Sequence, residues 1–130
     1  MEVLVDTSVW IDYFKGGSKS RAMEFLIDEN VLVTNDLILA ELIPYLKIQR
    51  QHKLIRLLRE LRRTPLDIDW SGIVDWQHAC LKAGANGLEI PDLIIAQHAK
   101  ANRVAIYSLD KHFKLLNKVI KVDLYSGMSN

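Results

Sequence analysis

Short runs of apolar residues alternate along the chain with longer stretches in which apolar residues recur every three or four positions. The short runs are typical of strands, and the longer spacing is typical of helices that bury one face. The runs predict strands over residues 2–5, 31–33, 104–107 and 120–124, with a weaker candidate around Leu66. The spacing predicts helices over residues 8–14, 19–27, 36–46, 53–61, 73–83, 92–101 and 111–116. Because strands and helices alternate, we expect an α/β sandwich around a mostly parallel central sheet.

Two prolines and a glycine mark expected helix boundaries. Pro44 lies late in the predicted helix 36–46, and we expect it to kink that helix or to mark its end, because proline has no backbone N–H. Pro91 suits the first turn of the helix that follows it, and Gly84 suits the residue after a helix.

Four acidic residues stand apart because each lies in an apolar run where a strand should end, or within or at the start of a helix. They are Asp6, Glu41, Asp92 and Asp110. An unpaired acid is costly to bury among leucines and isoleucines, so four of them favour a shared positive partner. Asp92 and Asp110 also suit helix starts for structural reasons alone, whereas Glu41 falls inside a helix, where no capping role explains it.

The predicted layout gives the four acids a common place in the fold. Asp6 and Asp110 follow strands, Asp92 opens a helix, and Glu41 lies about one turn into the helix after the second strand. In an open parallel sheet, ligands gather at the carboxyl ends of the strands. Carboxylate oxygens without histidine or thiolate partners favour Mg²⁺ or Mn²⁺ over zinc. For His98 and His112 we favour a surface or packing role, and an approach to the substrate is the alternative. The acids therefore predict a metal-dependent nuclease.

Length and composition exclude several other classes of protein. With 130 residues, we expect a single domain over residues 1–130, and 49% hydrophobic and 25% charged residues are ordinary for a globular protein. Cys80 is the one cysteine, which excludes an internal disulfide and a cysteine-based metal cage. The N-terminal segment has no cationic stretch followed by a long apolar run, so we expect a cytoplasmic protein without a membrane segment.

Basic residues are concentrated in one segment although the net charge is only +1. Residues 47–63 carry seven lysines and arginines and a single acid, Glu60. On a helix, the leucines of this segment form one stripe while Arg56, Arg59 and Arg63 fall on the opposite face. Two interpretations remain open: a solvated outer face, which we favour, or a flank that contacts nucleic-acid phosphates beside the acidic centre.

Aromatic residues are frequent in the early predicted helices. They are Trp10, Tyr13, Phe14, Phe25 and Tyr45. Aromatic side chains are enriched at interfaces, so we predict a hydrophobic groove or dimer surface here, with at least half of these residues serving core packing.

The ordered set of motifs resembles the PIN domain family, and is most similar to the VapC toxins of toxin–antitoxin pairs. The resemblance spans nearly the whole chain and rests on Val5-Asp6-Thr7-Ser8, Ala40-Glu41-Leu42, the stretch 84–92 that continues through Asp92-Leu93-Ile94-Ile95-Ala96, and Ser108-Leu109-Asp110-Lys111-His112-Phe113. It implies a three-layer α/β/α sandwich, Mg²⁺- or Mn²⁺-dependent endoribonuclease activity, homodimerisation, and inhibition by a small VapB-like antitoxin.

The resemblance also implies roles for individual residues. By position, Asp6, Glu41, Asp92 and Asp110 match the acidic quartet of the family, which would hold the metal. Thr7, Ser8 and Ser108 would supply supporting hydroxyls; Ser108 stands where the family usually has threonine, so the hydroxyl is retained. Glu89 adds an acid where the family pattern varies, and its membership of the site stays open.

Other functions remain as alternatives to a ribonuclease toxin. A PIN-type nuclease of RNA maturation or decay would share the site but have no antitoxin, and an adjacent small reading frame for a DNA-binding antitoxin would favour the toxin. A catalytically inactive PIN-like interaction module need not keep Glu41 in an apolar helix. A phosphoacceptor receiver domain should carry neighbouring acids after its first strand, which this sequence lacks.

Overall fold

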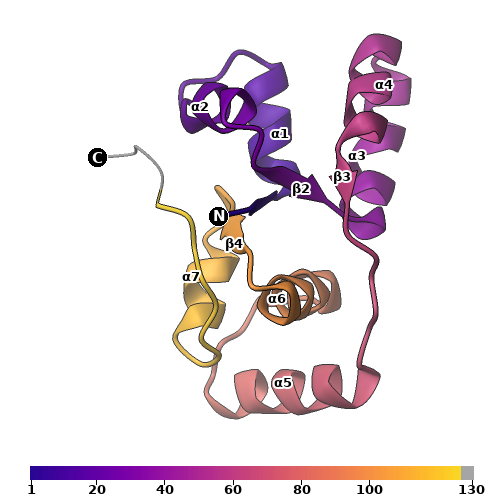
Figure 1. The fold of residues 1–130 in the computed structure, drawn as a ribbon. Helices are drawn as coiled ribbons and strands as arrows, with labels where there is room; N and C mark the ends of the chain where they lie inside the picture. Colours follow the sequence, from indigo (N-terminus) through magenta and orange to yellow (C-terminus); the bar gives the residue numbers. More distant parts are fainter. Residues whose placement is uncertain (127–130) are drawn as a thin grey trace.

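The centre of the fold is a parallel sheet (Figure 1), seen in a computed structural model that describes residues 1–126. Within these residues the sheet has four strands in the order β3-β2-β1-β4: β1 (Val3–Val5), β2 (Leu32–Thr34), β3 (Arg62–Arg63) and β4 (Ala105–Tyr107). All three pairings are parallel, which confirms the predicted parallel sheet. The chain first builds outward from β1 to β3 and then returns to place β4 on the other side of β1. The strand order therefore reverses between β1 and β4, the position at which open parallel sheets bind ligands.

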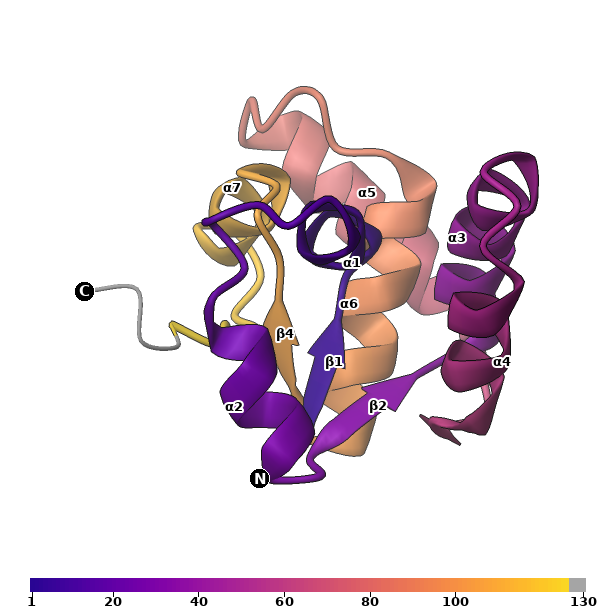
Figure 2. The same cartoon turned by 90° about the horizontal axis from the view of Figure 1, so that it is seen from above.

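Helices cover both faces of the sheet, as a three-layer α/β/α sandwich requires (Figures 1 and 2). Figure 2 shows α1 and α2 over one face and α6 over the other, with α5 packed outside α6. The described helices are α1 (Thr7–Phe14), α2 (Ala22–Asp28), α3 (Asp36–Ile48), α4 (His52–Glu60), α5 (Trp70–Lys82), α6 (Ile90–Asn102) and α7 (His112–Asn117). Each corresponds to a predicted helix. Within residues 1–126, no helix combines the length and the apolar character needed to cross a membrane.

The core explains why these short strands are stable. All three residues of β1 are completely buried, because β1 is a central strand covered by helices on both faces. Helix α6 buries Leu93, Ile94, Ile95 and Ala96 in a continuous run. The apolar residues that flank the acids at the ends of these elements therefore hold the acids in place.

Two of the predicted strands are placed differently in the structure. The segment 120–124 forms only an isolated bridge between Ile106 and Leu124, because the chain turns after α7 and the backbone N–H of Val122 bonds to the side chain of Asn117 at 2.8 Å. The weak candidate around Leu66 is replaced by β3 at Arg62–Arg63. A two-residue edge strand of arginines has no apolar alternation by which the sequence could reveal it.

The helix boundaries at the prolines and the glycine give mixed outcomes. Of the two outcomes expected at Pro44, the end of the helix is excluded, because α3 continues to Ile48 and Leu46 after the proline is buried in the core, while the kink stays a prediction. That burial offsets the hydrogen bond that proline cannot make. Pro91 lies in the first turn of α6, and Gly84 follows α5 with a φ of +74°, as predicted.

Candidate metal centre

Asp6 is the most buried of the four acids. It follows β1 directly, precedes α1, and is 8% exposed. Its Oδ2 accepts hydrogen bonds from the hydroxyls of Ser8 and Ser108, each at 2.8 Å. Because Ser8 belongs to α1 and Ser108 follows β4, the Asp6 carboxylate links the two strands at which the strand order reverses.

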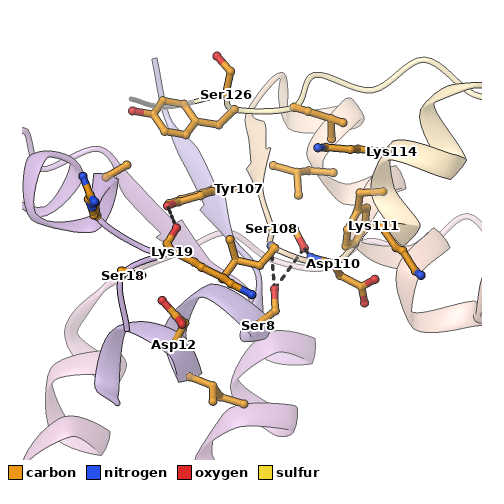
Figure 3. A pocket seen from close by; sticks show the side chains of 18 of the residues that line it. Ser8, Asp12, Ser18, Lys19, Tyr107, Ser108, Asp110, Lys111, Lys114 and Ser126 are labelled. Carbon is orange, nitrogen blue, oxygen red and sulfur yellow. Dashed lines mark hydrogen bonds between the residues drawn. The ribbon is translucent and has the colours of Figure 1, made fainter. Parts of the chain in front are cut away.

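The two serines also order the loop that carries Asp110 (Figure 3). The Ser8 hydroxyl accepts from the backbone N–H of Leu109 at 3.0 Å, and the Ser108 hydroxyl accepts from the backbone N–H of Asp110 at 2.9 Å. Each hydroxyl thus donates to Asp6 and accepts from this loop. The Asp110 carboxylate in turn accepts from the backbone N–H of His112 at 2.9 Å, just at the start of α7.

Glu41 reaches the same region from α3. Its Oε1 accepts a hydrogen bond from the Thr7 hydroxyl at 3.1 Å, immediately after Asp6 in the chain. The pKa of Glu41 is raised, mainly by partial desolvation, and the negative charges of Asp6, Asp92 and Glu89 raise it further, against the opposing Thr7 bond. The carboxylate of Glu41 therefore lies in the field of the other acids.

Asp92 joins the site from the first turn of α6. Its Oδ2 accepts from the backbone N–H of Glu89 at 3.0 Å, and the Glu89 side chain caps the same turn in return, which makes a reciprocal capping box. Partial burial is the main cause of a raised pKa of Asp92, with repulsion from Asp110 and Asp6 adding to it. The Glu89 bond and nearby His112 lower that pKa. Glu89 thus has a structural role as a cap.

His112 lies between two of the acids, although the sequence favoured a surface or packing role for it. Its Nδ1 is 3.5 Å from Oδ2 of Asp92 and 3.3 Å from Oδ1 of Asp110. The sequence did not place His112 beside Asp92, because that contact forms only where the start of α7 meets the first turn of α6. The one available signal was its position two residues after Asp110.

The donor atoms fit a divalent cation. One ligand atom from each of Asp92, Asp110 and His112 lies within 4.8 Å of the others. Two ligands on opposite sides of one ion lie about 4–5 Å apart, since metal–oxygen bonds are about 2.0–2.6 Å long. Asp6 and Glu41 lie beside this group, and they add two further carboxylates of the kind that Mg²⁺ and Mn²⁺ prefer.

The arginines of the basic segment do not join the acids. Arg63 forms an ion pair with Asp36 at 3.2 Å, and Arg59 and Arg63 line a separate groove of about 290 Å³ with Pro44 and its neighbours on α3. Arg56 is exposed on α4. The solvated outer face stays the favoured interpretation of these arginines, with contact to nucleic-acid phosphates as the alternative.

The aromatic residues of the early helices divide between core and surface. Trp10 is buried and stacks on Phe14 with ring centroids 5.5 Å apart, whereas Tyr13 and Phe14 are half-buried. Phe25 on α2 is 45% exposed. Tyr45 is half-buried on α3.

Comparisons with known proteins agree with this geometry. A family model described as PIN domain matches residues 3–119. The chain is similar in structure to VapBC2 from Rickettsia felis bound to a DNA fragment from their promoter (TM-score 0.75, 21% identity, 96% of this chain and 98% of that chain). It is also similar to VapBC-1 from nontypeable Haemophilus influenzae (TM-score 0.72, 20% identity, 96% and 97% covered). A third similar structure is VapC20 from Mycobacterium tuberculosis, described as a sarcin–ricin loop cleaving toxin (TM-score 0.64, 15% identity, 94% and 99% covered). No curated protein matches the sequence. At these identities the structural likeness shows the fold.

Proposed function

This chain belongs to the PIN domain family, and on that basis we propose that it is a metal-dependent endoribonuclease, the toxin of a toxin–antitoxin pair. The observation that carries the proposal is that acids from four separate parts of the chain lie beside the reversal of strand order. Asp6 is held there by two serine hydroxyls, Glu41 approaches from α3, and Asp92 and Asp110 share His112.

The energetics of the acids support a cation as their partner. Glu41 and Asp92 both have raised pKa values, caused first by desolvation and then by neighbouring carboxylates. Crowded, partly desolvated carboxylates destabilise the metal-free chain at neutral pH, and a bound cation would offset that cost. The oxygen-rich donor set favours Mg²⁺ or Mn²⁺.

Each residue has a distinct role in this proposal. Asp92, Asp110 and His112 offer ligand atoms, and Asp6 and Glu41 supply further negative charge. When bound, the cation would lower the pKa of a water and stabilise charge on a phosphodiester. Ser8 and Ser108 keep Asp6 in one orientation, so the site is ordered before substrate arrives.

The choice of RNA and the toxin role rest on relatives. The similar structure described as a sarcin–ricin loop cleaving toxin supports RNA as the substrate class. The VapBC structures from Rickettsia felis and Haemophilus influenzae support a small VapB-like antitoxin as a partner. We also propose that the protein acts in the cytoplasm as a homodimer.

The test is cleavage of total RNA with Mg²⁺ or Mn²⁺, beside a chelator and beside the Asp6→Asn variant. We expect cleavage only by the unaltered protein with metal, and mapping of the cut ends would then define its target. Cleavage that persists in chelator would reject the metal dependence, and an absence of cleavage under every metal condition would reject the nuclease. Co-expression with the product of an adjacent small reading frame tests the toxin role, and we expect that product to inhibit cleavage.

A further inference from the structure

A cleft of about 890 Å³ opens directly beside the candidate metal centre (Figure 3). Its walls come from α1, the turn before α2, and α7, and its floor includes Ile106 and Tyr107 of β4. Ser8, Ser108 and Asp110 line the end at which it meets the acids. The cleft is therefore continuous with the place where we propose cleavage.

Cations dominate the rim of this cleft, which we call the lysine cleft. Its basic residues are Lys15, Lys19, Arg21, Lys111 and Lys114. The acids that line it are Asp12 and Asp110, which leaves a net charge of +3 in the cleft, whereas the whole chain carries only +1. Asp12 lies against Gly17, in the space that a Cβ at Gly17 would need, so it also serves the turn after α1.

The five cations of the lysine cleft are available to a ligand. All five are exposed, and none of them forms an ion pair with a carboxylate in the part of the chain that the structure describes. By contrast, Arg62 pairs with Glu2 and Arg63 pairs with Asp36. Like charges that converge without partners repel one another, and a polyanion placed between them relieves the repulsion.

We propose that the lysine cleft holds the phosphate backbone of single-stranded RNA and leads it to the metal centre. The proposal rests on the proposed nuclease function and specifies where its substrate lies. The lysines come from both sides of the cleft, with Lys15 at the end of α1 and Lys114 in α7. A strand between them would have its phosphates contacted from both sides, without any need for base recognition.

The experiment measures RNA affinity as a function of salt, in an Asp6→Asn background so that the substrate survives. The cleft variant carries Lys15→Gln, Lys19→Gln and Lys114→Gln. The comparison variant carries Lys53→Gln, Arg56→Gln and Arg59→Gln on α4 and removes the same charge. For the cleft variant we expect weaker binding and a logarithmic salt slope that is smaller by about 2, since each phosphate contact contributes about 0.7. For the α4 variant we expect an unchanged slope.

Other outcomes overturn the proposal. An unchanged slope in the cleft variant, or an equal loss in both variants, would exclude the lysine cleft as the RNA path. If the cleft variant fails to fold by circular dichroism, the single substitutions Lys15→Gln and Lys114→Gln replace it, each with an expected slope change of about 0.7. Cleavage by the unaltered protein with an unchanged slope in these variants would reject the cleft and keep the nuclease. A smaller slope in these variants, together with no cleavage by the unaltered protein, would keep the cleft as an RNA-binding site and reject the nuclease.

Discussion

The side-chain amide of Asn35 donates a hydrogen bond to Nδ1 of His98 across 2.9 Å, and both residues are buried. The Oδ1 of Asn35 accepts from the backbone N–H of Ile38 at 2.9 Å as the cap of α3, so the NH₂ group must face the histidine. Because that group only donates, Nδ1 of His98 is an acceptor and the ring carries its proton on Nε2. This bond ties α3, which carries Glu41, to α6, which carries Asp92.

The neutral ring of His98 predicts a loss of stability in acid. Burial is the main cause of a lowered pKa of His98, although nearby backbone of Pro65 and Thr64 opposes it. Below a pH of about 6.5 the unfolded chain binds a proton that the folded chain does not, so the free energy of unfolding falls with pH by up to about 1.4 kcal/mol per unit. The loss ends once pH falls below the lowered folded pKa. Denaturant unfolding in chelator at several pH values measures it.

The control for this effect is His98→Leu, which cannot titrate. Glu41 and Asp92 have raised pKa values and act in the opposite direction, since the folded chain gains stability as they bind protons. The informative quantity is therefore the difference between the two proteins. We expect the variant to be less stable at neutral pH, because Asn35 loses a buried acceptor, and to lack the acid-dependent loss. Parallel curves would reject the role given to His98.

Replacing Asp92 with Asn should separate stability from activity. The substitution is nearly isosteric and can still accept the bond from Glu89, but it removes a partly desolvated charge whose pKa is raised by its surroundings. We expect the metal-free variant to be as stable as the parent or more stable, and cleavage to fall by at least about 100-fold, because residues one step removed from a metal already cost about 10- to 100-fold. Thermal melts in chelator and initial cleavage rates test this.

Asp75→Asn on α5 is the matched control, because it makes the same chemical change at an exposed acid that is not among the charges acting on Glu41 or Asp92. It should alter neither quantity. Full cleavage by Asp92→Asn at saturating Mg²⁺ would remove Asp92 from the metal centre, whatever its effect on stability.

Added metal should stabilise the protein in a pH-dependent way. A cation that binds only the folded chain raises the free energy of unfolding with the logarithm of its concentration once that concentration exceeds Kd, and the melting temperature rises with it. Metal binding needs deprotonated carboxylates, and the raised pKa values of Glu41 and Asp92 place competition with protons above their usual values of 4.5 and 3.8. Mn²⁺ affinity should therefore weaken as pH falls through that raised range. Glu41→Gln should weaken Mn²⁺ affinity at neutral pH and make it less dependent on pH, which calorimetric titration measures directly.

The acids of the candidate site could be recognised in the sequence because the free-energy cost of burying a carboxylate depends on the residues next to it in the chain. A carboxylate such as Asp6 or Glu41 among leucines and isoleucines needs a reason at its own position, and the alternation of strands and helices indicated a common edge. His112 carries no such signal, since its importance arises only where α6 meets α7. Its role could not be deduced from neighbouring residues.

The basic residues show the same difference between groups that are close in the sequence and groups that only the fold brings together. The segment 47–63 stood out because its cations recur about every three residues, yet two of them, Arg62 and Arg63, are paired with acids. The lysine cleft collects its cations from two distant segments, residues 15–21 and 111–114, so no single window of sequence displays it. Similarly, residues 120–124 have the apolar pattern of a strand but pair with β4 at one position only, because pairing depends on the turn before them.

The last prediction concerns the aromatic surface of α1 and α2 as a site for partners. Tyr13 donates to Glu24 at 2.8 Å and so fixes these helices together, and this leaves Phe25 exposed beside them. We expect Phe25→Ser to weaken antitoxin binding or dimerisation by about tenfold or more, as loss of an aromatic anchor does. Leu57→Ser, at an exposed leucine on α4, is the control and should change neither. Light scattering at micromolar concentration measures dimerisation, and co-purification measures antitoxin binding. If the unaltered protein is a monomer and no partner co-purifies with it, this surface is not a site for partners.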